Sequence, residues 1–354
     1  MQAVSTPVAT APVVKKYGKS SSFYLGGKNA YFEANDRLLA DEMVRNALYL
    51  QQPLRSGCKI CGTPLQATSD FVSHGVAYHF CEHCGHLNGA HEETQAFLDG
   101  LYTGTTAGGY ATGYIDKNYQ HRAETIYVPK VEFLLEQLEE DERSLLDVGC
   151  GSGHFVYACL SLGLQASGVD VGEPMINFGN TQIAALLDRQ PLVHSAPGDV
   201  FKHVLDTRCK VVSAIGVIEH LKSPAEFFAA FQASQAEYLY YSVPMFSTSV
   251  VLENAFPSVY PRQLAGGHTH LFTESSLREM HARHGVAPVA EWRFGTDMMD
   301  LYRALLVKLA ANGASNALVS RFERGFGPKI DAMQAALDGN DFCSEIHCLV
   351  RKQR

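Results

Sequence analysis

The sequence contains no long hydrophobic run. The longest mainly apolar stretch that we find is Val211 to Ile218, whereas a helix that crosses a bilayer needs about 20 apolar residues. The opening stretch MQAVSTPVATAPVV has no basic residue and is interrupted by prolines, so it lacks the charged start and apolar centre of a secretory signal. These absences argue against a membrane span and predict a cytoplasmic protein.

Positive charge is also scarce. The chain of 354 residues has 29 Lys and Arg against 37 Asp and Glu, a formal net charge of −8. A protein that binds along a nucleic acid must neutralise many phosphates, so this balance disfavours such a partner and leaves only a local basic patch open. The chain as a whole is not a disordered one, because 46% of its residues are hydrophobic and can form a packed core.

The residue pattern along the chain indicates two main parts. Residues 1–20 are rich in Ser, Thr, Pro and Ala, which predicts a disordered leader. Residues 21–115 hold one expected helix, over 35–52, and a turn-rich module with clustered cysteines. Residues 116–354 alternate strand and helix signals, which predicts a mostly parallel, doubly wound α/β sheet with a helical insertion over 297–340. Expected strands lie at 144–148, 166–171, 211–215, 238–243, 286–294 and 342–351.

Four of the nine cysteines form two pairs with the spacing C-x2-C-x19-C-x2-C. Such pairs can deliver four thiolates tetrahedrally to zinc, and four thiolates leave no open position for catalysis. The sequence therefore predicts a small zinc-ribbon-like module with a structural zinc ion. A redox dithiol would explain one C-x-x-C pair but is disfavoured by two at this spacing. The expected zinc ligands are Cys58, Cys61, Cys81 and Cys84.

A glycine-rich turn follows the first strand of the second part. In LLDVGCGSGHF, the strand runs into Gly149, Gly151 and Gly153 and then into an apolar helix. Glycines at such a turn permit positive φ and let a ligand approach the backbone, where the helix N-terminus offers free N–H groups. Asp170 ends the next strand, about 20 residues on, where an acid can bind a ribose diol. A dinucleotide is the weaker interpretation, because the third glycine of G-x-G-x-x-G falls on His154.

These motifs, taken together, resemble the class I S-adenosylmethionine-dependent methyltransferases. The resemblance implies their seven-stranded Rossmann-like sheet, with the methionine end of the cofactor at the glycine turn and the ribose at Asp170. It also implies that the third loop, Gly198-Asp199-Val200, meets the adenine. Arg122, on the helix before the first strand, can pair with the methionine carboxylate or be solvated. Asp147 can contact the cofactor directly or order the glycine loop by hydrogen bonds.

Two further segments extend the resemblance. The stretch VVSAIGVIEHLKSP looks like the family's fourth strand with its Glu-His pair at Glu219 and His220, and HTHLFTESSLREM resembles a later family segment through His268. Ligands bind at the carboxyl edge of such sheets, and imidazole has the right intrinsic pKa to accept a proton from a hydroxyl. We therefore expect His220 to be the base, with His268 as the rival and Glu219 as a group that orients either imidazole or caps the next helix.

A four-cysteine zinc module before such a domain resembles the bacterial methyltransferases that act on sugars and nucleotide-linked keto sugars. This resemblance implies methylation of a sugar or nucleotide-sugar in surface-polysaccharide or deoxysugar biosynthesis, and O-methylation is favoured because the chain ends at Arg354, where the C-methyltransferases usually carry a further domain. The Gly/Thr-rich segment 103–113 is expected to close over the ligands. The alternatives are a methyltransferase that acts on RNA or protein through its zinc module, and a non-catalytic zinc-stabilised interaction protein. The sequence does not indicate the oligomeric state.

Overall fold

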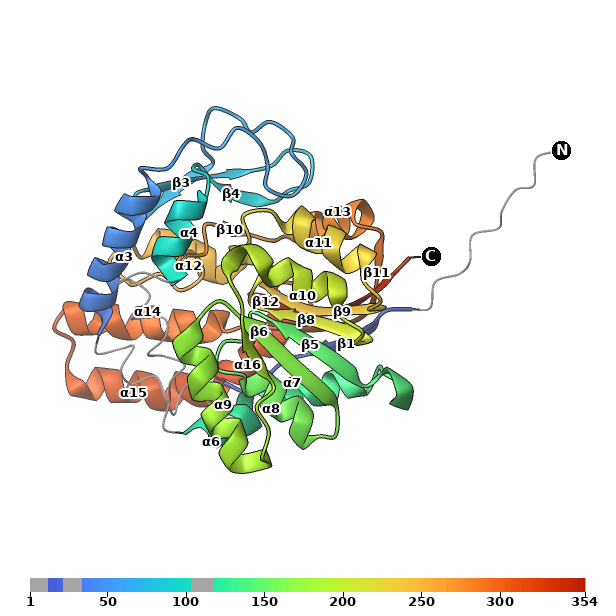
Figure 1. Cartoon of the computed structure of the whole chain (residues 1–354). Helices are drawn as coiled ribbons and strands as arrows, with labels where there is room; N and C mark the ends of the chain where they lie inside the picture. The colour runs from blue at the N-terminus through green and yellow to red at the C-terminus, as the bar shows by residue number, and fades with distance from the viewer. Residues whose placement is uncertain (1–11, 22–33, 103–117, 266, 354) are drawn as a thin grey trace.

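The computed structural model describes residues 12–21, 34–102, 118–265 and 267–353, and a large central sheet organises them (Figure 1). Strand β12 is antiparallel to both of its neighbours, and every other neighbouring pair is parallel. The predicted doubly wound, mostly parallel α/β fold is thus confirmed. The strand order is β1 (Val14–Tyr17), β11 (Val286–Phe294), β12 (Glu345–Lys352), β9 (Tyr238–Pro244), β8 (Val211–Ile215), β5 (Ser144–Val148), β6 (Gln165–Asp170) and β7 (Leu192–His194).

Strand β1 lies in the segment that the sequence analysis assigned to a disordered leader over 1–20. It pairs with β11 and forms the edge of the sheet, so the prediction is wrong for Val14–Tyr17. The Lys16 ammonium lies 4.5 Å from the ring centroid of Trp292, and the Trp292 indole N–H donates to the Gly18 carbonyl at 2.9 Å. The composition of this segment does not predict the strand, because the strand depends on a distant partner. The free edge of β11 offers unpaired backbone groups, and four residues with a contact to Trp292 are enough to pair with it.

Helices cover both faces of the sheet, as side-chain alternation along the strands requires. One face packs on α7 (Val128–Leu135) and α8 (His154–Ser161), with α9 (Glu173–Leu187) beside them. The other face packs on α10 (Val200–Asp206), α11 (Pro224–Ala233) and α13 (Glu274–Arg283). All seven residues of β9 are buried. No helix in the described ranges has both the length and the apolar character that a membrane crossing demands.

A second, antiparallel sheet of four strands carries the cysteine module, above the central sheet in Figure 1. Three strands come from the N-terminal part: β2 (Phe71–Ser73), β3 (Val76–Phe80) and β4 (Leu87–Gly89). The fourth, β10 (His270–Leu271), comes from the second part and pairs with β4. The helices α3 (Asn35–Tyr49) and α4 (Gln95–Tyr102) flank the module, and α3 confirms the helix expected over 35–52. The two parts of the chain therefore share one sheet.

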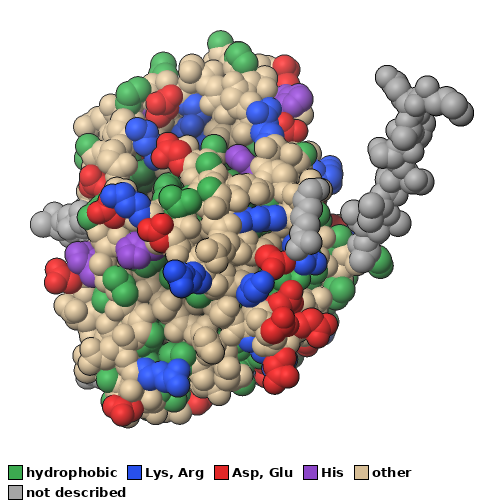
Figure 2. All heavy atoms as spheres, turned by 45° about the vertical axis from the view of Figure 1, so that its right-hand side comes forward, with side chains coloured by type: hydrophobic (Ala, Val, Ile, Leu, Met, Phe, Trp, Pro, Cys, Tyr) green, Lys and Arg blue, Asp and Glu red, His purple; other side chains and the backbone are tan. Residues whose placement is uncertain are grey.

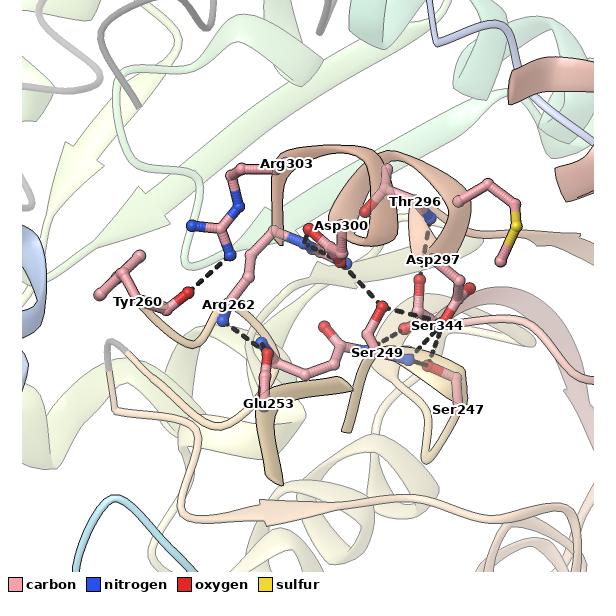
Figure 3. A network of polar contacts seen from close by, with 12 residues as sticks. Ser247, Ser249, Glu253, Tyr260, Arg262, Thr296, Asp297, Asp300, Arg303 and Ser344 are labelled. Atoms are coloured by element: carbon pink, nitrogen blue, oxygen red, sulfur yellow. Dashed lines mark hydrogen bonds and ion pairs between the residues drawn. The ribbon is translucent and has the colours of Figure 1, made fainter. Parts of the chain in front are cut away.

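The predicted helical insertion is confirmed and consists of α14 (Asp297–Ala311), α15 (Asn316–Phe326) and α16 (Ile330–Asp338). A buried polar network, shown in Figure 3, joins α14 to α12 (Thr248–Ala255). At its centre the fully buried Asp297 carboxylate accepts hydrogen bonds from the Ser247 hydroxyl at 2.5 Å and from the Ser249 N–H and hydroxyl at 2.9 Å each. Hydrogen bonds, rather than apolar packing alone, thus hold the start of α14.

Replacing Asp297 by Asn should therefore destabilise the fold. The amide nitrogen cannot accept hydrogen bonds, so at least one charged hydrogen bond is lost, and we expect the free energy of unfolding to fall by about 1.5–3 kcal/mol. The matched control is Asp199→Asn, because Asp199 pairs with Lys202 and both side chains are at least half exposed, where such pairs contribute about 0–1 kcal/mol. Urea denaturation of both variants tests the prediction, and equal losses would contradict it.

Candidate active site

The glycine turn lies between β5 and α8 and has the predicted backbone conformation. Gly149, Gly151 and Gly153 all have positive φ, between 53° and 71°. A Cβ on Gly149 or Gly153 would lie 2.5–2.6 Å from a Val217 or Leu192 methyl group, whereas one on Gly151 would meet no atom within 4 Å. The turn is thus packed on two sides and open at Gly151, as a cradle for a ligand requires.

Asp170, at the end of β6, organises this turn. Its buried carboxylate accepts hydrogen bonds from the Gly151 N–H at 2.8 Å and from the Gly172 N–H at 2.7 Å. Each carboxylate oxygen has a second lone pair, so the same group can still accept hydrogen bonds from a diol. The sequence predicted the position of Asp170 but not its bond to the glycine turn, which becomes visible only when β5 and β6 are paired.

Asp147 is the acidic residue before the turn. To order the glycine loop, its carboxylate would have to accept hydrogen bonds from that loop, but its partner lies on β8 instead. It is buried at the end of β5, and its carboxylate accepts a hydrogen bond from the Ser213 hydroxyl on β8 at 2.6 Å. Burial raises the pKa of Asp147 to about 7. Asp147 therefore links two central strands, and Asp170 holds the loop.

Aromatic residues support the turn from the helix before the sheet, α6 (Tyr119–Arg122). The Tyr119 hydroxyl donates to the Ser152 carbonyl at 3.0 Å, and its ring stacks on His154 with 4.2 Å between centroids. Arg122 follows Tyr119 by three residues, a spacing that puts both on one helix face. Tyr119 was not singled out from the sequence, because a tyrosine in a helix carries no signal for a glycine loop 30 residues away.

Asp199 and Val200 lie after β7, where the sequence placed the third loop. Asp199 ends the short 3-10 helix Pro197–Asp199, and its side chain is about half exposed and pairs with Lys202 at 2.5 Å. This ion pair lowers the pKa of Asp199. Val200 begins α10 and packs against the main core. Asp199 and Val200 are thus both partly exposed, and they follow the carboxyl end of β7.

Glu219, His220 and His268 converge after β8, although 48 residues separate the two histidines. One ligand-type atom of each lies within 4.8 Å of the others, and the histidine rings stack with 5.0 Å between centroids. Val217, which touches Gly149, precedes this group, so it lies beside the glycine turn. Burial raises the pKa of Glu219 to about 8 and lowers that of His268 to about 4. Burial, with His268 nearby, holds the pKa of His220 well below its usual value.

A chain of buried histidines connects this cluster to the cysteine module. The Glu219 carbonyl can only accept, so His270 Nε2 donates to it, at 2.8 Å. His270 Nδ1 must then accept from His86 Nε2, also at 2.8 Å. Both imidazoles are fully buried, and burial lowers the pKa of each well below its usual value, so both are neutral and the two hydrogen bonds define their tautomers. The sequence gives no signal for this contact, because His86 and His270 are 184 positions apart.

A second connection runs through an ion cluster. Glu93 pairs with Arg55 at 2.6 Å and with Lys59 at 3.1 Å, and it also accepts a hydrogen bond from Thr269. Lys59 lies between two of the clustered cysteines, and Thr269 lies between His268 and His270. The cysteine module therefore holds the 268–270 segment by charge as well as by strand pairing.

The four cysteines come together as their spacing predicts. Cys58 and Cys84 have their sulfurs 3.6 Å apart, and Cys61 and Cys81 have theirs 3.5 Å apart. Four thiolates around one zinc ion, each with a bond of about 2.3 Å, lie about 3.8 Å from one another, so the cluster fits zinc. Gly62 and Gly85 follow the pairs with positive φ, and the Gly62 and Gly85 N–H groups donate to the Cys58 and Cys81 carbonyls.

The expected closing segment 103–113 lies outside the described residues. A narrow pocket on the described surface reaches His268 from the module side and has both aromatic and charged walls, formed by Glu42, Arg45, Tyr49, Phe97 and Leu101 among others. An aromatic surface beside polar groups suits a small polar acceptor.

Comparison with known proteins supports the interpretation of the glycine turn. Residues 119–291 match a family model described as a methyltransferase domain. This part of the chain is an S-adenosylmethionine-dependent methyltransferase domain. No curated protein matches it.

Solved methyltransferase structures are similar to this chain at low identity. Magnesium protoporphyrin IX methyltransferase from Synechocystis PCC 6803 has 12% identity and a TM-score of 0.45 over 71% of this chain and 97% of its own. A methyltransferase from Archaeoglobus fulgidus has 17% identity and a TM-score of 0.41 over 67% and 100%. The plantazolicin methyltransferase BamL has 12% identity and a TM-score of 0.45 over 73% and 94%.

We predict that Asp170→Asn weakens binding of S-adenosylmethionine by about 10- to 150-fold. This range corresponds to the loss of about 1.5–3 kcal/mol when a charged acceptor is removed. Isothermal titration calorimetry measures the effect, with Asp188→Asn as the control, because Asp188 is exposed and has a left-handed backbone that asparagine tolerates. Equal affinity in both variants would show that Asp170 holds only the loop.

Proposed function

We propose that this methyltransferase transfers a methyl group from S-adenosylmethionine to a hydroxyl of a sugar or nucleotide-sugar in deoxysugar or surface-polysaccharide biosynthesis. The observation that carries the proposal is the convergence of Glu219, His220 and His268 beside the glycine turn. A hydroxyl acceptor must lose a proton as it is methylated, and a partly buried pair of neutral imidazoles next to the methyl donor suits that task.

The cofactor contacts in this proposal follow the carboxyl edge of the sheet. Gly149, Gly151 and Gly153 hold the methionine end, and Asp170 accepts hydrogen bonds from the ribose hydroxyls. The open space at Gly151 and the spare lone pairs of Asp170 support these roles. Further contacts are proposed for Arg122 at the methionine carboxylate, for Asp147 behind the turn, and for Asp199 and Val200 at the adenine.

The chemistry needs one base and close alignment. The sulfonium of the bound donor supplies an activated methyl group. His220 Nε2 accepts the proton of the acceptor hydroxyl while the oxygen forms its bond to the methyl carbon and the carbon–sulfur bond breaks. His268 is the alternative base, and Glu219 orients the imidazoles. Aligning the reacting atoms can contribute up to about 7–11 kcal/mol in favourable intramolecular cases.

The lining of the pocket at His268 supports a polar, hydroxyl-bearing acceptor. The pocket at His268 has the aromatic walls Tyr49 and Phe97 with the Arg45–Glu42 ion pair beside them, and such walls suit a neutral, hydroxyl-rich ring. On the face shown in Figure 2, lysines and arginines are interspersed with acidic side chains, unlike the basic track that a nucleic acid requires.

The four cysteines serve in this proposal as ligands of a structural zinc ion. Their sulfur separations support tetrahedral coordination, and the turns at Gly62 and Gly85 are those of paired knuckles. Because β4 of this module pairs with β10, the zinc ion stabilises the segment that carries His268.

Replacing His220 by Ala should lower kcat by about 10²- to 10⁴-fold, the usual cost of removing a general base. The lowered pKa of His220 keeps the imidazole neutral to lower pH, so the acid-side decline of kcat/KM should lie below the ordinary histidine pKa of about 6.5. Turnover is measured with nucleotide-sugar acceptors, and His203→Ala on α10 is the control. Normal turnover in His220→Ala with loss in His268→Ala would move the base to His268.

A further inference from the structure

We propose that Glu219, His220 and His268 form a binding site for one divalent transition-metal ion, separate from the four-cysteine site. The inference rests on the proposed function for its chemistry and changes the part of His220 from general base to metal ligand. Two imidazoles and one carboxylate are a ligand set that suits Mn²⁺, Fe²⁺, Co²⁺ or Zn²⁺ and leaves positions open for other ligands.

Distance is the first argument. Glu219 Oε1 lies 4.0 Å from His220 Nε2, and a ligand-type atom of His268 lies within 4.8 Å of both residues. Three ligand atoms that each lie about 2.1 Å from one ion are about 3.0–3.6 Å apart on average, so these atoms, which now lie within 4.8 Å of one another, need to move at most about 1–2 Å closer together.

The Glu219 carboxyl provides an independent argument. Glu219 is 3% exposed, and its Oε2 atom is buried without a hydrogen-bond partner. A buried carboxyl oxygen normally has a partner, and a cation beside it would supply one. Open space adjoins the other oxygen of the same carboxyl group, because a Cβ built on Gly216 would meet only Glu219 Oε1 within 4 Å, at 3.7 Å.

The tautomer of His268 is the one that a metal ligand needs. The Gln263 carbonyl can only accept, so His268 Nδ1 carries the proton and donates to it at 3.1 Å. The lone pair is therefore on Nε2. A second ring nitrogen that donates to a carbonyl is the usual outer-shell arrangement of metal-binding histidines.

The Gln263 carbonyl is itself held in place by the network in Figure 3. The Glu253 carboxylate accepts from the N–H groups of Arg262, Gln263 and Leu264, and Arg262 pairs with Asp300 at 2.8 Å. The His268 ring is thus oriented by a rigid, buried framework before any ion binds, as a pre-organised site requires.

The ion would activate the acceptor oxygen directly. The hydroxyl oxygen binds the ion, and its O–H bond breaks with release of the proton to solvent. The oxygen then forms a bond to the methyl carbon while the carbon–sulfur bond electrons go to sulfur. An acceptor with a second oxygen next to the methylated hydroxyl would chelate the ion, which favours sugars with adjacent oxygens.

Titration of the zinc-loaded protein with Co²⁺ tests the site. We expect one Co²⁺ per chain, with the weak visible bands of nitrogen and oxygen ligands and without the strong near-ultraviolet bands of thiolate ligands. Glu219→Gln and His268→Ala should each weaken Co²⁺ binding by about 10- to 100-fold or more, and His203→Ala should leave it unchanged. Circular dichroism and zinc content verify that each variant is folded.

Thiolate bands alone, or unchanged Co²⁺ affinity in both variants, would overturn the proposal. So would full methyl transfer in protein that retains its four-cysteine zinc but has been freed of any second ion. That result would leave the proposed function intact with His220 as the base. Failure of the proposed function would instead appear as absent methyl transfer to nucleotide-sugar acceptors, and the Co²⁺ titration reports the metal site in either case.

Discussion

The pairing of β10 with β4 is the constraint on which the candidate active site depends. It places His270 opposite Asn88 and Leu271 opposite Leu87, so the cysteine module and the methyltransferase domain share a sheet. The buried chain from His86 through His270 to the Glu219 carbonyl then fixes the loop after β8. This pairing holds the strand that follows His268 next to the loop that carries His220.

Electrostatics reinforces the same junction. Glu93, Lys59 and Arg55 form a buried ion cluster in which the two cations lower the pKa of Glu93 to about 2, although burial opposes its ionisation. Removing one member of such a cluster leaves an uncompensated buried charge, which is strongly destabilising. Each of the three charged side chains is therefore stable in the interior only when the other two are present.

Local patterns allowed much of the fold to be predicted from the sequence. Strands β5, β8 and β11 match their predicted ranges. Short stretches with several apolar residues, bounded by turns, predict strands from the local sequence alone. The cysteine pairs and the glycine turn could also be predicted from the sequence, since each depends on residue spacing within a short segment. The helical insertion followed from the same kind of local periodicity.

Features set by distant contacts could not be predicted in this way. Strand β10 has two residues and exists only because β4 is beside it, and β1 exists only because β11 offers an edge. The bond from Asp170 to Gly151 and the relay through His270 join residues that are remote in sequence. The candidate site was thus predicted as a set of residues, while its internal connections required the structure.

The central claim is that the cysteine module builds the acceptor side of the site and leaves the cofactor side independent. The most direct measurement compares the unmodified protein with Cys58→Ser, in a buffer that contains any divalent ion needed for full activity. The account predicts that Cys58→Ser loses its zinc, binds S-adenosylmethionine with nearly unchanged affinity, and loses methyl transfer. Retained methyl transfer after loss of zinc, or loss of S-adenosylmethionine binding together with transfer, would contradict it.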